Sequence, residues 1–184
     1  LRSVTVRGVG GLRGGGGNDR IDVENCTLRR LVRLLTDDGD DDLVVADTRF
    51  EGPVRVVGSA EPDRIVLRRC TTTGAGDLVV VTQGGADLVN LESCALGQNV
   101  ILRTGAGDDT VQIVDSECGE NVVGSLGSGD DRLSIGDSTF DEDVELSGGK
   151  HDDTLDLDGG NEFPGQVSRP DKYKVRFRSF EHDD

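Results

Sequence analysis

The sequence predicts an all-β protein: a single-stranded, right-handed parallel β-helix of about seven 22-residue coils with three short strands each. The first observation is composition, with 34% hydrophobic and 3% aromatic residues, 27 Gly and no Trp or Met. Such a chain cannot fill a core with large side chains and has to stack small aliphatic ones in a regular array. The second observation is a repeat, in which an aspartate is followed by apolar residues two and four positions later. The repeat anchors are Asp19, Asp41, Asp63, Asp87, Asp109, Asp131 and Asp153, spaced 22, 22, 24, 22, 22 and 22 residues apart.

Each repeat contains three apolar pairs with a period of two residues, which is typical of strands with one buried face. In the fifth repeat, the pair after the anchor is Val111 and Ile113, and the pair before it is Val100 and Leu102. A third pair lies seven and nine residues after an anchor, such as Cys94 and Leu96. Right-handedness follows from the strong preference of parallel crossovers for that hand. The two additional residues between Asp63 and Asp87 are expected in the corner 71-TTTGAG-76.

The domain organisation follows from where the repeat stops. Residues 1–159 are predicted to form the coils, and residues 160–184 a C-terminal capping segment, because the exposed strand edges of a solenoid need covering. Within this segment we expect a last strand around Val175 and Phe177, with Phe163 and Phe180 over the terminal coil. The chain opens at Leu1 without Met, so we expect a domain of a larger bacterial protein.

The four cysteines are predicted to be free. Cys26, Cys70 and Cys94 occupy the same position of the repeat that Thr48 and Ser116 fill elsewhere, so they belong to an inward row of small residues. Stacked residues have parallel Cα–Cβ vectors, which is poor geometry for a disulfide. We expect buried thiols that act as small hydrophobic groups.

The turns before the anchors are rich in glycine and aspartate. The segment 14-GGGGNDRID-22 matches the pattern G-G-x-G-x-D-x-aliphatic-x, and 104-TGAGDDTVQ-112 and 126-LGSGDDRLS-134 match it except for the first glycine. These turns resemble those of haemolysin-type (repeats-in-toxin) calcium-binding proteins. The resemblance implies Ca²⁺ between stacked turns, with Asp19, Asp109 and Asp131 as ligands and Asp153 as a looser candidate. The alternative is a structural row, in which turn N–H groups cap the carboxylates and solvent screens their charge.

Charge and surface pattern restrict the partners. With 36 acidic and 20 basic residues the formal net charge is −16, so no nucleic acid is expected as a partner. No apolar run of 18 residues exists, so no membrane insertion is expected. Outward positions before the anchors carry aliphatic residues, including Val79, Val81, Ile101 and Val123. This stripe either reflects strand propensity and lies under the C-terminal segment, or it contacts a neighbouring domain or a second copy.

The function that the sequence favours is a non-enzymatic structural or adhesive β-helix module of a larger surface or secreted protein, with other domains of that protein as partners. An extracellular or cell-surface location is expected. The alternative is a polysaccharide-binding or polysaccharide lyase-like β-helix, with a carbohydrate as ligand, since lyases also use this fold. The nearly constant period leaves no room for the long loops above a lyase site, and His151 and His182 lie in a turn and in the tail. No catalytic residue is therefore predicted.

Overall fold

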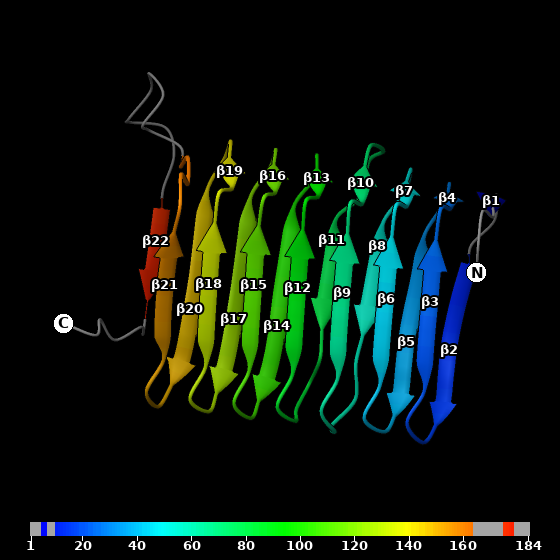
Figure 1. The fold of residues 1–184 in the computed structure, drawn as a ribbon, viewed down its shortest axis with the longest axis horizontal. Coiled ribbons are helices and arrows are strands. Elements are labelled where there is room, and N and C mark those ends of the chain that lie inside the picture. The colour runs from blue at the N-terminus through cyan, green and yellow to red at the C-terminus, as the bar shows by residue number, and fades with distance from the viewer. Residues whose placement is uncertain (1–4, 7–9, 164–174, 179–184) are drawn as a thin grey trace.

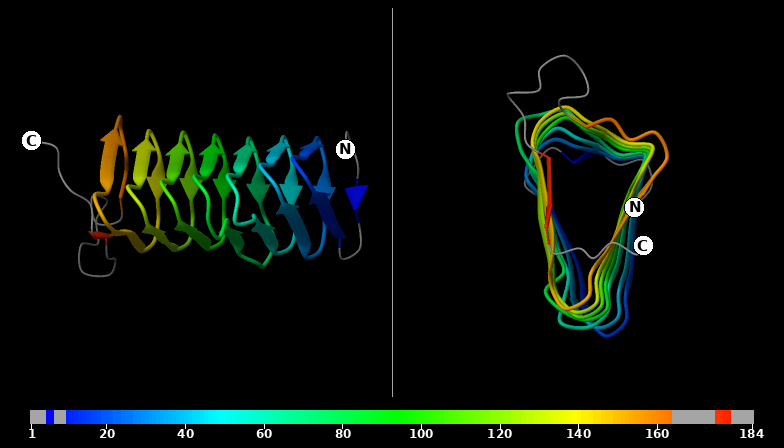
Figure 2. Two further views of the ribbon diagram at one scale, coloured as in Figure 1. Left: turned by 90° about the horizontal axis from the view of Figure 1, so that it is seen from below. Right: turned by 90° about the vertical axis from the view of Figure 1, so that its left-hand side faces the viewer.

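The computed structural model describes residues 5–6, 10–163 and 175–178 of the chain. All of its regular elements are strands, and they stack into three parallel sheets that together form a β-helix of about seven coils (Figure 1). Viewed along the rod, successive coils superpose on a three-sided outline (Figure 2). The predicted fold class is confirmed in its architecture, its three strands per coil and its 22-residue spacing, while its right hand stays a prediction.

Each sheet takes one strand from every coil. Sheet A contains β3 (Arg20–Glu24), β6 (Asp42–Ala46), β9 (Arg64–Arg68), β12 (Leu88–Glu92), β15 (Thr110–Val114), β18 (Arg132–Gly136) and β21 (Thr154–Asp158). Sheet B contains β1 (Thr5–Val6), β4 (Thr27–Leu28), β7 (Arg49–Phe50), β10 (Thr71–Thr72), β13 (Ala95–Leu96), β16 (Glu117–Cys118) and β19 (Thr139–Phe140). Sheet C contains β2 (Gly10–Gly16), β5 (Val32–Asp38), β8 (Val54–Val57), β11 (Leu78–Val81), β14 (Val100–Ala106), β17 (Val122–Ser128), β20 (Val144–Lys150) and β22 (Val175–Arg178).

The register confirms where the two additional residues lie. In sheet B, Thr72 pairs with Phe50 and with Leu96, and in sheet C, Leu78 pairs with Val54 and with Val100. The step from Phe50 to Thr72 is still 22 residues, whereas the step from Val54 to Leu78 is 24. The insertion therefore falls between Thr72 and Leu78, at the corner between sheets B and C, where it widens a turn without breaking a ladder.

The core consists of inward rows of aliphatic side chains, one row from each apolar position of the repeat. The fully buried members include Leu34, Leu43, Leu67, Leu91 and Leu102. In the last strand of sheet A the inward side chains are less buried, and Leu157 is 46% exposed. The ring of Phe163 stacks on Phe140 at 5.1 Å between centroids and packs against the core, as expected for a cap.

The capping segment is described only in part. β22 pairs in parallel with β20, which confirms the strand expected around Val175 and Phe177. Phe180 lies outside the described residues. The division of the chain at residue 159 stays a prediction. Among the described residues there is no helix long and apolar enough to cross a membrane.

The cysteines are free and buried, as predicted. In their row the hydroxyls of Ser and Thr accept backbone hydrogen bonds from the preceding coil, as when Cys94 N–H donates to Ser116 Oγ at 3.1 Å. Burial raises the pKa of Cys118 to about 12. The thiol therefore stays protonated at neutral pH and serves as a core group.

Candidate functional site: a buried aspartate ladder

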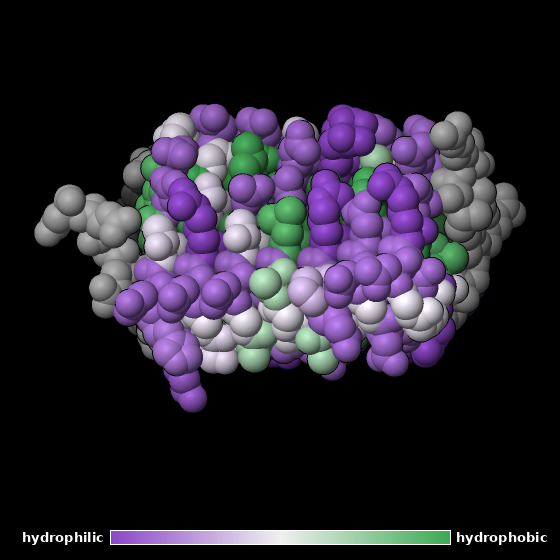
Figure 3. Space-filling model, turned by 60° about the horizontal axis from the view of Figure 1, so that its bottom comes forward, coloured by the Kyte–Doolittle hydropathy of each residue, from purple (hydrophilic) through white to green (hydrophobic). Residues whose placement is uncertain are grey.

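The seven anchor aspartates form a continuous row at the turns that lead from sheet C into sheet A. In Figure 1 these turns lie along the lower edge of the rod, and Figure 3 shows that edge covered mainly by hydrophilic and small residues. The anchors do not belong to this surface. From Asp41 to Asp153 each anchor residue is 1–3% exposed, and only Asp19, in the first coil, is partly exposed.

Hydrogen bonds run along this row from one coil to the next. The backbone N–H of each anchor donates to Oδ1 of the anchor in the following coil. The donor–acceptor distances are 2.6 Å (Asp19 to Asp41), 3.3 Å (Asp41 to Asp63), 2.8 Å (Asp63 to Asp87), 2.8 Å (Asp87 to Asp109), 2.8 Å (Asp109 to Asp131) and 3.0 Å (Asp131 to Asp153). We refer to these seven residues as the aspartate ladder. Capping by turn N–H groups is thus confirmed, but screening by solvent was wrong, because the carboxyl groups lie inside the fold.

The inward direction follows from strand parity. Asp109 precedes the inward residues Val111 and Ile113 by two and four positions, and side chains two residues apart in an extended segment share a face. The turn itself is narrow. Gly105 and Gly107 have φ of +113° and +121°, and a Cβ at either would collide with the backbone of the preceding coil at Gln83 and Gly85. Only glycine allows the coils to approach closely here.

One oxygen of most ladder carboxyls has no partner. The Oδ2 atoms of Asp41, Asp87, Asp109, Asp131 and Asp153 are buried without a hydrogen bond. Asp63 differs, since its Oδ2 accepts the Ser59 N–H at 2.7 Å. Burying a carboxylate oxygen without a hydrogen-bond partner costs free energy. A proton or a cation bound to these atoms would remove that cost.

The pKa values of the ladder respond to this environment. Burial raises the pKa of Asp87 to about 7 and that of Asp131 to about 6. Burial also raises the pKa of Asp63, Asp109 and Asp153 above the ordinary value of an aspartate. Desolvation penalises the charged form and dominates over the hydrogen bonds that favour it.

The hydrogen bonds of the threonines beside the ladder also favour protonated carboxyl groups. The hydroxyl of Thr82 lies next to the Asp87 carboxyl but donates its single proton to the Thr104 carbonyl at 3.0 Å. In the next coil, Thr104 lies beside Asp109 and donates to the Leu126 carbonyl at 2.7 Å. Each hydroxyl oxygen can still accept a hydrogen bond. A proton on the neighbouring carboxyl would therefore give both groups a partner.

A second acidic row lies one residue earlier on the same turns. Asp108 Oδ1 accepts the Asp130 N–H at 3.0 Å, and Asp130 Oδ1 accepts the Asp152 N–H at 3.3 Å. In the first coil Asn18 Oδ1 accepts the Asp40 N–H at 3.2 Å. The acidic members Asp40, Asp108, Asp130 and Asp152 are exposed, so water solvates their remaining oxygens. We refer to these four as the outer acidic row.

The predicted calcium ligands Asp19, Asp109, Asp131 and Asp153 all belong to the ladder. They lie in one row, but Asp109, Asp131 and Asp153 each contribute only one unpartnered oxygen, whereas Ca²⁺ takes six to eight oxygen ligands. Within the described parts of the chain, His, Cys, Asp and Glu do not gather in groups of three or more that could hold a metal ion. Calcium at these residues would need backbone carbonyls of the turns as additional ligands, and it stays a prediction.

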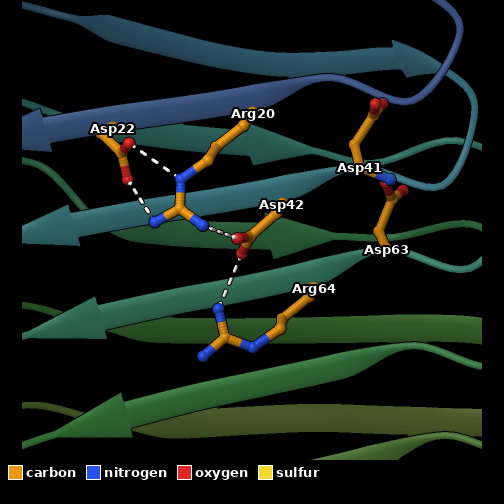
Figure 4. Close-up of polar contacts among 6 residues, drawn as sticks. All are labelled: Arg20, Asp22, Asp41, Asp42, Asp63 and Arg64. Carbon is orange, nitrogen blue, oxygen red and sulfur yellow. Dashed lines mark hydrogen bonds and ion pairs between the residues drawn. The ribbon is translucent and has the colours of Figure 1, made fainter.

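The arginines near the ladder belong to a different surface. On the outer face of sheet A, Arg20 pairs with Asp22 and Asp42, and Arg64 also pairs with Asp42 at 2.7 Å (Figure 4). In the same view Asp41 and Asp63 lie apart from this network, at the turn. Arg69 pairs instead with Asp47 at 2.6 Å. Arg64 and Arg69 are therefore already paired with surface carboxylates.

A shallow groove of about 370 Å³ runs along the corner between sheets A and B. Its charged lining residues are Arg69, Asp115, Glu117 and Asp137, and Thr71 and Thr139 add hydroxyl groups. Arg69, Asp115 and Asp137 have positive φ of 47° to 51°, because the chain turns sharply at this corner in every coil. This corner brings together residues from four coils that sequence reasoning did not group.

No protein-family model, curated protein or solved structure matches the chain. The β-helix is therefore defined by the geometry itself, and the similarity of the turns to the haemolysin-type nonapeptide remains a resemblance of short segments.

Proposed function

We propose that this protein is a non-enzymatic structural module, a rigid β-helical rod within a larger surface or secreted protein. The observation that carries the proposal is the unbroken ladder of backbone and aspartate hydrogen bonds, which links every coil to the next. In a solenoid each coil is stabilised only by its neighbours, so continuous ladders are what make it resist bending and pulling.

The position of the acidic residues supports a structural role over a lyase. Carboxylates that act on a polymer have to reach it, whereas six of the seven anchors are buried. His151 is exposed, but its Nδ1 accepts the Gly129 N–H at 3.1 Å and so links the turn of the last coil to that of the preceding coil. Both kinds of side chain stabilise stacking of the coils.

The structural role can be tested by pulling and by turnover assays. In single-molecule stretching between the two termini, we expect high forces and stepwise lengthening by about one coil at a time, as for a quasi-one-dimensional array. Incubation with a panel of neutral and uronate polysaccharides, followed by reducing-end and unsaturated-product assays, should give no turnover. Turnover would overturn the non-enzymatic proposal, and unfolding at low force would overturn the rod.

Calcium stabilisation is tested separately. If Ca²⁺ binds the ladder, the thermal midpoint should rise with millimolar Ca²⁺ and fall with EDTA, since a ligand that binds only the folded state stabilises it. Mg²⁺ at the same concentration is the control for ionic strength. The Asp109→Asn and Asp131→Asn variants should lose this response. A midpoint that ignores Ca²⁺ would exclude the metal.

Polysaccharide binding without catalysis is the second candidate, and the groove along the corner between sheets A and B favours it. Arg69 and the carboxylates of Asp115, Glu117 and Asp137 offer donors and acceptors to sugar hydroxyls along four coils. Affinity electrophoresis in gels with embedded polysaccharide should then show retardation that Glu117→Gln reduces. Glu145→Gln, on a different sheet, is the matched control. Equal retardation of the two variants would exclude the groove.

A further inference from the structure

The outer face of sheet C differs in composition from the rest of this acidic protein. In β5, β8, β11, β14 and β17, the first two outward positions of each strand carry six aliphatic residues, three arginines and one serine. None of these ten positions is acidic, although the chain has 36 acidic residues and 20 basic ones. The six aliphatic residues, which we call the aliphatic stripe, are Leu35, Val57, Val79, Val81, Ile101 and Val123.

The register of the strands arranges the aliphatic stripe in one diagonal line. Its middle lies on β11, where Val79 and Val81 occupy both outward rows. Toward β5 the line continues in the row of Val81, and toward β17 in the row of Val79. Val123 is 46% exposed and the other members are partly exposed. A contiguous exposed apolar surface of this kind marks an interaction site.

Arginines border the stripe on both sides. Arg33 and Arg55 lie two residues before the stripe members of β5 and β8, whereas Arg103 lies two residues after Ile101 on β14. They therefore flank opposite edges of the line. All three are exposed, and within the described residues none forms an ion pair or a side-chain hydrogen bond. On sheet A, by contrast, arginines such as Arg64 pair with carboxylates.

These charges favour a partner with carboxylates along two edges. Arg33 and Arg55 are directly opposite each other on neighbouring strands. Two like charges in this position repel, and a carboxylate placed between them would relieve the repulsion. Arg103 offers a third exposed guanidinium, which can donate two parallel hydrogen bonds to a carboxylate. The face therefore fits a narrow apolar surface that is bordered by acidic groups on both sides.

An amphipathic α-helix has such a surface. Apolar residues at positions i, i+3, i+4 and i+7 form a narrow line along a helix, and polar residues border it on both sides. The stripe crosses five strands about 4.8 Å apart, so it is about 19 Å long, which about 13 helical residues would span. Successive coils superpose along the rod, so a straight element can follow the line (Figure 2). An extended strand presents only alternate side chains to a sheet and cannot border its own apolar row on both sides.

The described part of the chain supplies no such helix. Its regular elements are all strands, and the stretches outside it are each 11 residues or shorter. We propose that the aliphatic stripe binds an acidic amphipathic helix of a partner protein, with its carboxylates beside Arg33 and Arg55 on one edge and Arg103 on the other. Aliphatic side chains at the centre and ion pairs at the rim match the usual anatomy of protein interfaces. This inference does not depend on whether the rod is purely structural or binds polysaccharide.

Binding of designed peptides to the full chain tests the proposal. The probe is a helical peptide of about 18 residues, or five turns, with leucines in one line and glutamates along both edges. One control has the same composition but carries its glutamates on the face opposite the leucines, and a second has lysines in place of glutamates. In fluorescence anisotropy at low salt, the probe should bind at least about 10-fold more tightly than either control. Failure of the probe to bind, or equal binding of the probe and the first control, would overturn the proposal.

Substitutions on the face locate the bound helix. Arg103→Glu and Ile101→Asp should each weaken binding of the probe at least about 10-fold, through charge repulsion and through loss of apolar contact. The matched controls Arg132→Glu and Val114→Asp place the same changes at outward positions of sheet A and should bind the probe like the wild type. Circular dichroism verifies that all four variants are folded. Equal losses in the variants and their controls would contradict the assignment of the face.

A peptide with exchanged charges tests whether the arginines border opposite edges. It carries glutamates along one edge of its leucine line and lysines along the other. This peptide should bind Arg103→Glu more tightly than the wild type, because its lysines then face the substituted residue while Arg33 and Arg55 still face glutamates. Tighter binding to the wild type would overturn this arrangement.

Two other occupants of the face have distinct outcomes. In sedimentation equilibrium, Ile101→Asp should leave the oligomeric state of the chain unchanged, and a dimer that this substitution dissociates would assign the face to a second copy. Flotation with vesicles of phosphatidylglycerol should recover no protein, and binding that Arg103→Glu abolishes would assign the face to a membrane. Either of these assignments would overturn the proposal.

Discussion

The aspartate ladder and the outer acidic row occupy the same turns, one residue apart, with the same residue type and spacing. Both use Oδ1 to accept a backbone N–H from a neighbouring coil. Yet Asp109 is 1% exposed with a raised pKa caused by burial, whereas Asp108 lies in solvent. A shift of one residue exchanges the two faces of an extended chain, and with them the electrostatic environment. In this protein the environment of an aspartate therefore depends on which face of the extended chain it occupies, and much less on the local sequence motif.

Removing one carboxyl group from each row should give the largest difference between the two rows in the free energy of unfolding. Asp109→Ala leaves the Asp87 N–H buried without an acceptor, so at pH 5 the free energy of unfolding should fall by about 2 to 3 kcal/mol. Asp108→Ala should change it by at most about 0.5 kcal/mol, because water replaces the lost acceptor. Urea denaturation of the two variants and the wild type measures the difference. Equal losses would contradict the distinction between the rows.

The dependence of stability on pH should come from the ladder. A carboxyl with a raised pKa binds its proton more tightly in the folded state, so its contribution is fully present below the unfolded pKa of about 4. This contribution is lost as the pH rises through the folded values of about 6 for Asp131 and about 7 for Asp87. The wild-type chain should therefore be more stable at pH 5 than at pH 8. Denaturation midpoints across this range measure the effect.

Asn variants sharpen this prediction, because an amide has the shape of a protonated carboxyl. Asp87→Asn keeps an acceptor for the Asp63 N–H and adds donors beside Thr82. It should be more stable than the wild type by about 1 to 2 kcal/mol at pH 8, since each pKa unit corresponds to about 1.4 kcal/mol. Asp130→Asn, in the outer acidic row, is the matched control and should keep the loss of stability that comes from Asp87, because Asp130 does not contribute to the raised pKa of Asp87. An unchanged profile in Asp87→Asn would show that this residue is not the titrating group.

The smallest effect is expected for the ion pairs on the outer face of sheet A. Arg64 and Asp42 approach to 2.7 Å, but their side chains are 49% and 28% exposed. Arg64→Ala should therefore cost less than about 1 kcal/mol, and the cost should shrink in 1 M NaCl. Urea denaturation at low and high salt measures it. A large, salt-independent loss would show that a surface charge here matters as much as a ladder residue.

Much of the fold could be predicted from periodicity. The anchors at Asp41 and Asp109 mark coils that the structure shows in register, and the insertion after Asp63 lies at the expected corner. These features could be predicted because, in a parallel solenoid, residues at the same position of the repeat contact each other in successive coils. The ends were less predictable. Leu157 follows the inward pattern, but it is largely exposed because no further strand of sheet A covers it among the described residues.

The candidate site was predicted in its residues but not in its environment. The pattern of Asp109 followed by Val111 and Ile113 already contained the parity that turns the carboxyl inward. The glycine-rich motif instead favoured an exposed calcium-binding turn. The groove at Arg69 and Glu117 could not be inferred, because its residues are separated by 48 positions and come together only through stacking.

The amino-acid sequence by itself determined the period, the three strands of each coil and the residues that face inward, because these depend on alternation along one strand. Only the tertiary structure decided what the aspartates experience. Burial between neighbouring coils desolvates the carboxyl groups, and most of the N–H groups that they accept belong to the preceding coil, as when the Asp87 N–H donates to Asp109. A carboxyl group acquires its pKa from the groups packed around it, and many of those groups lie about 22 residues away in the chain.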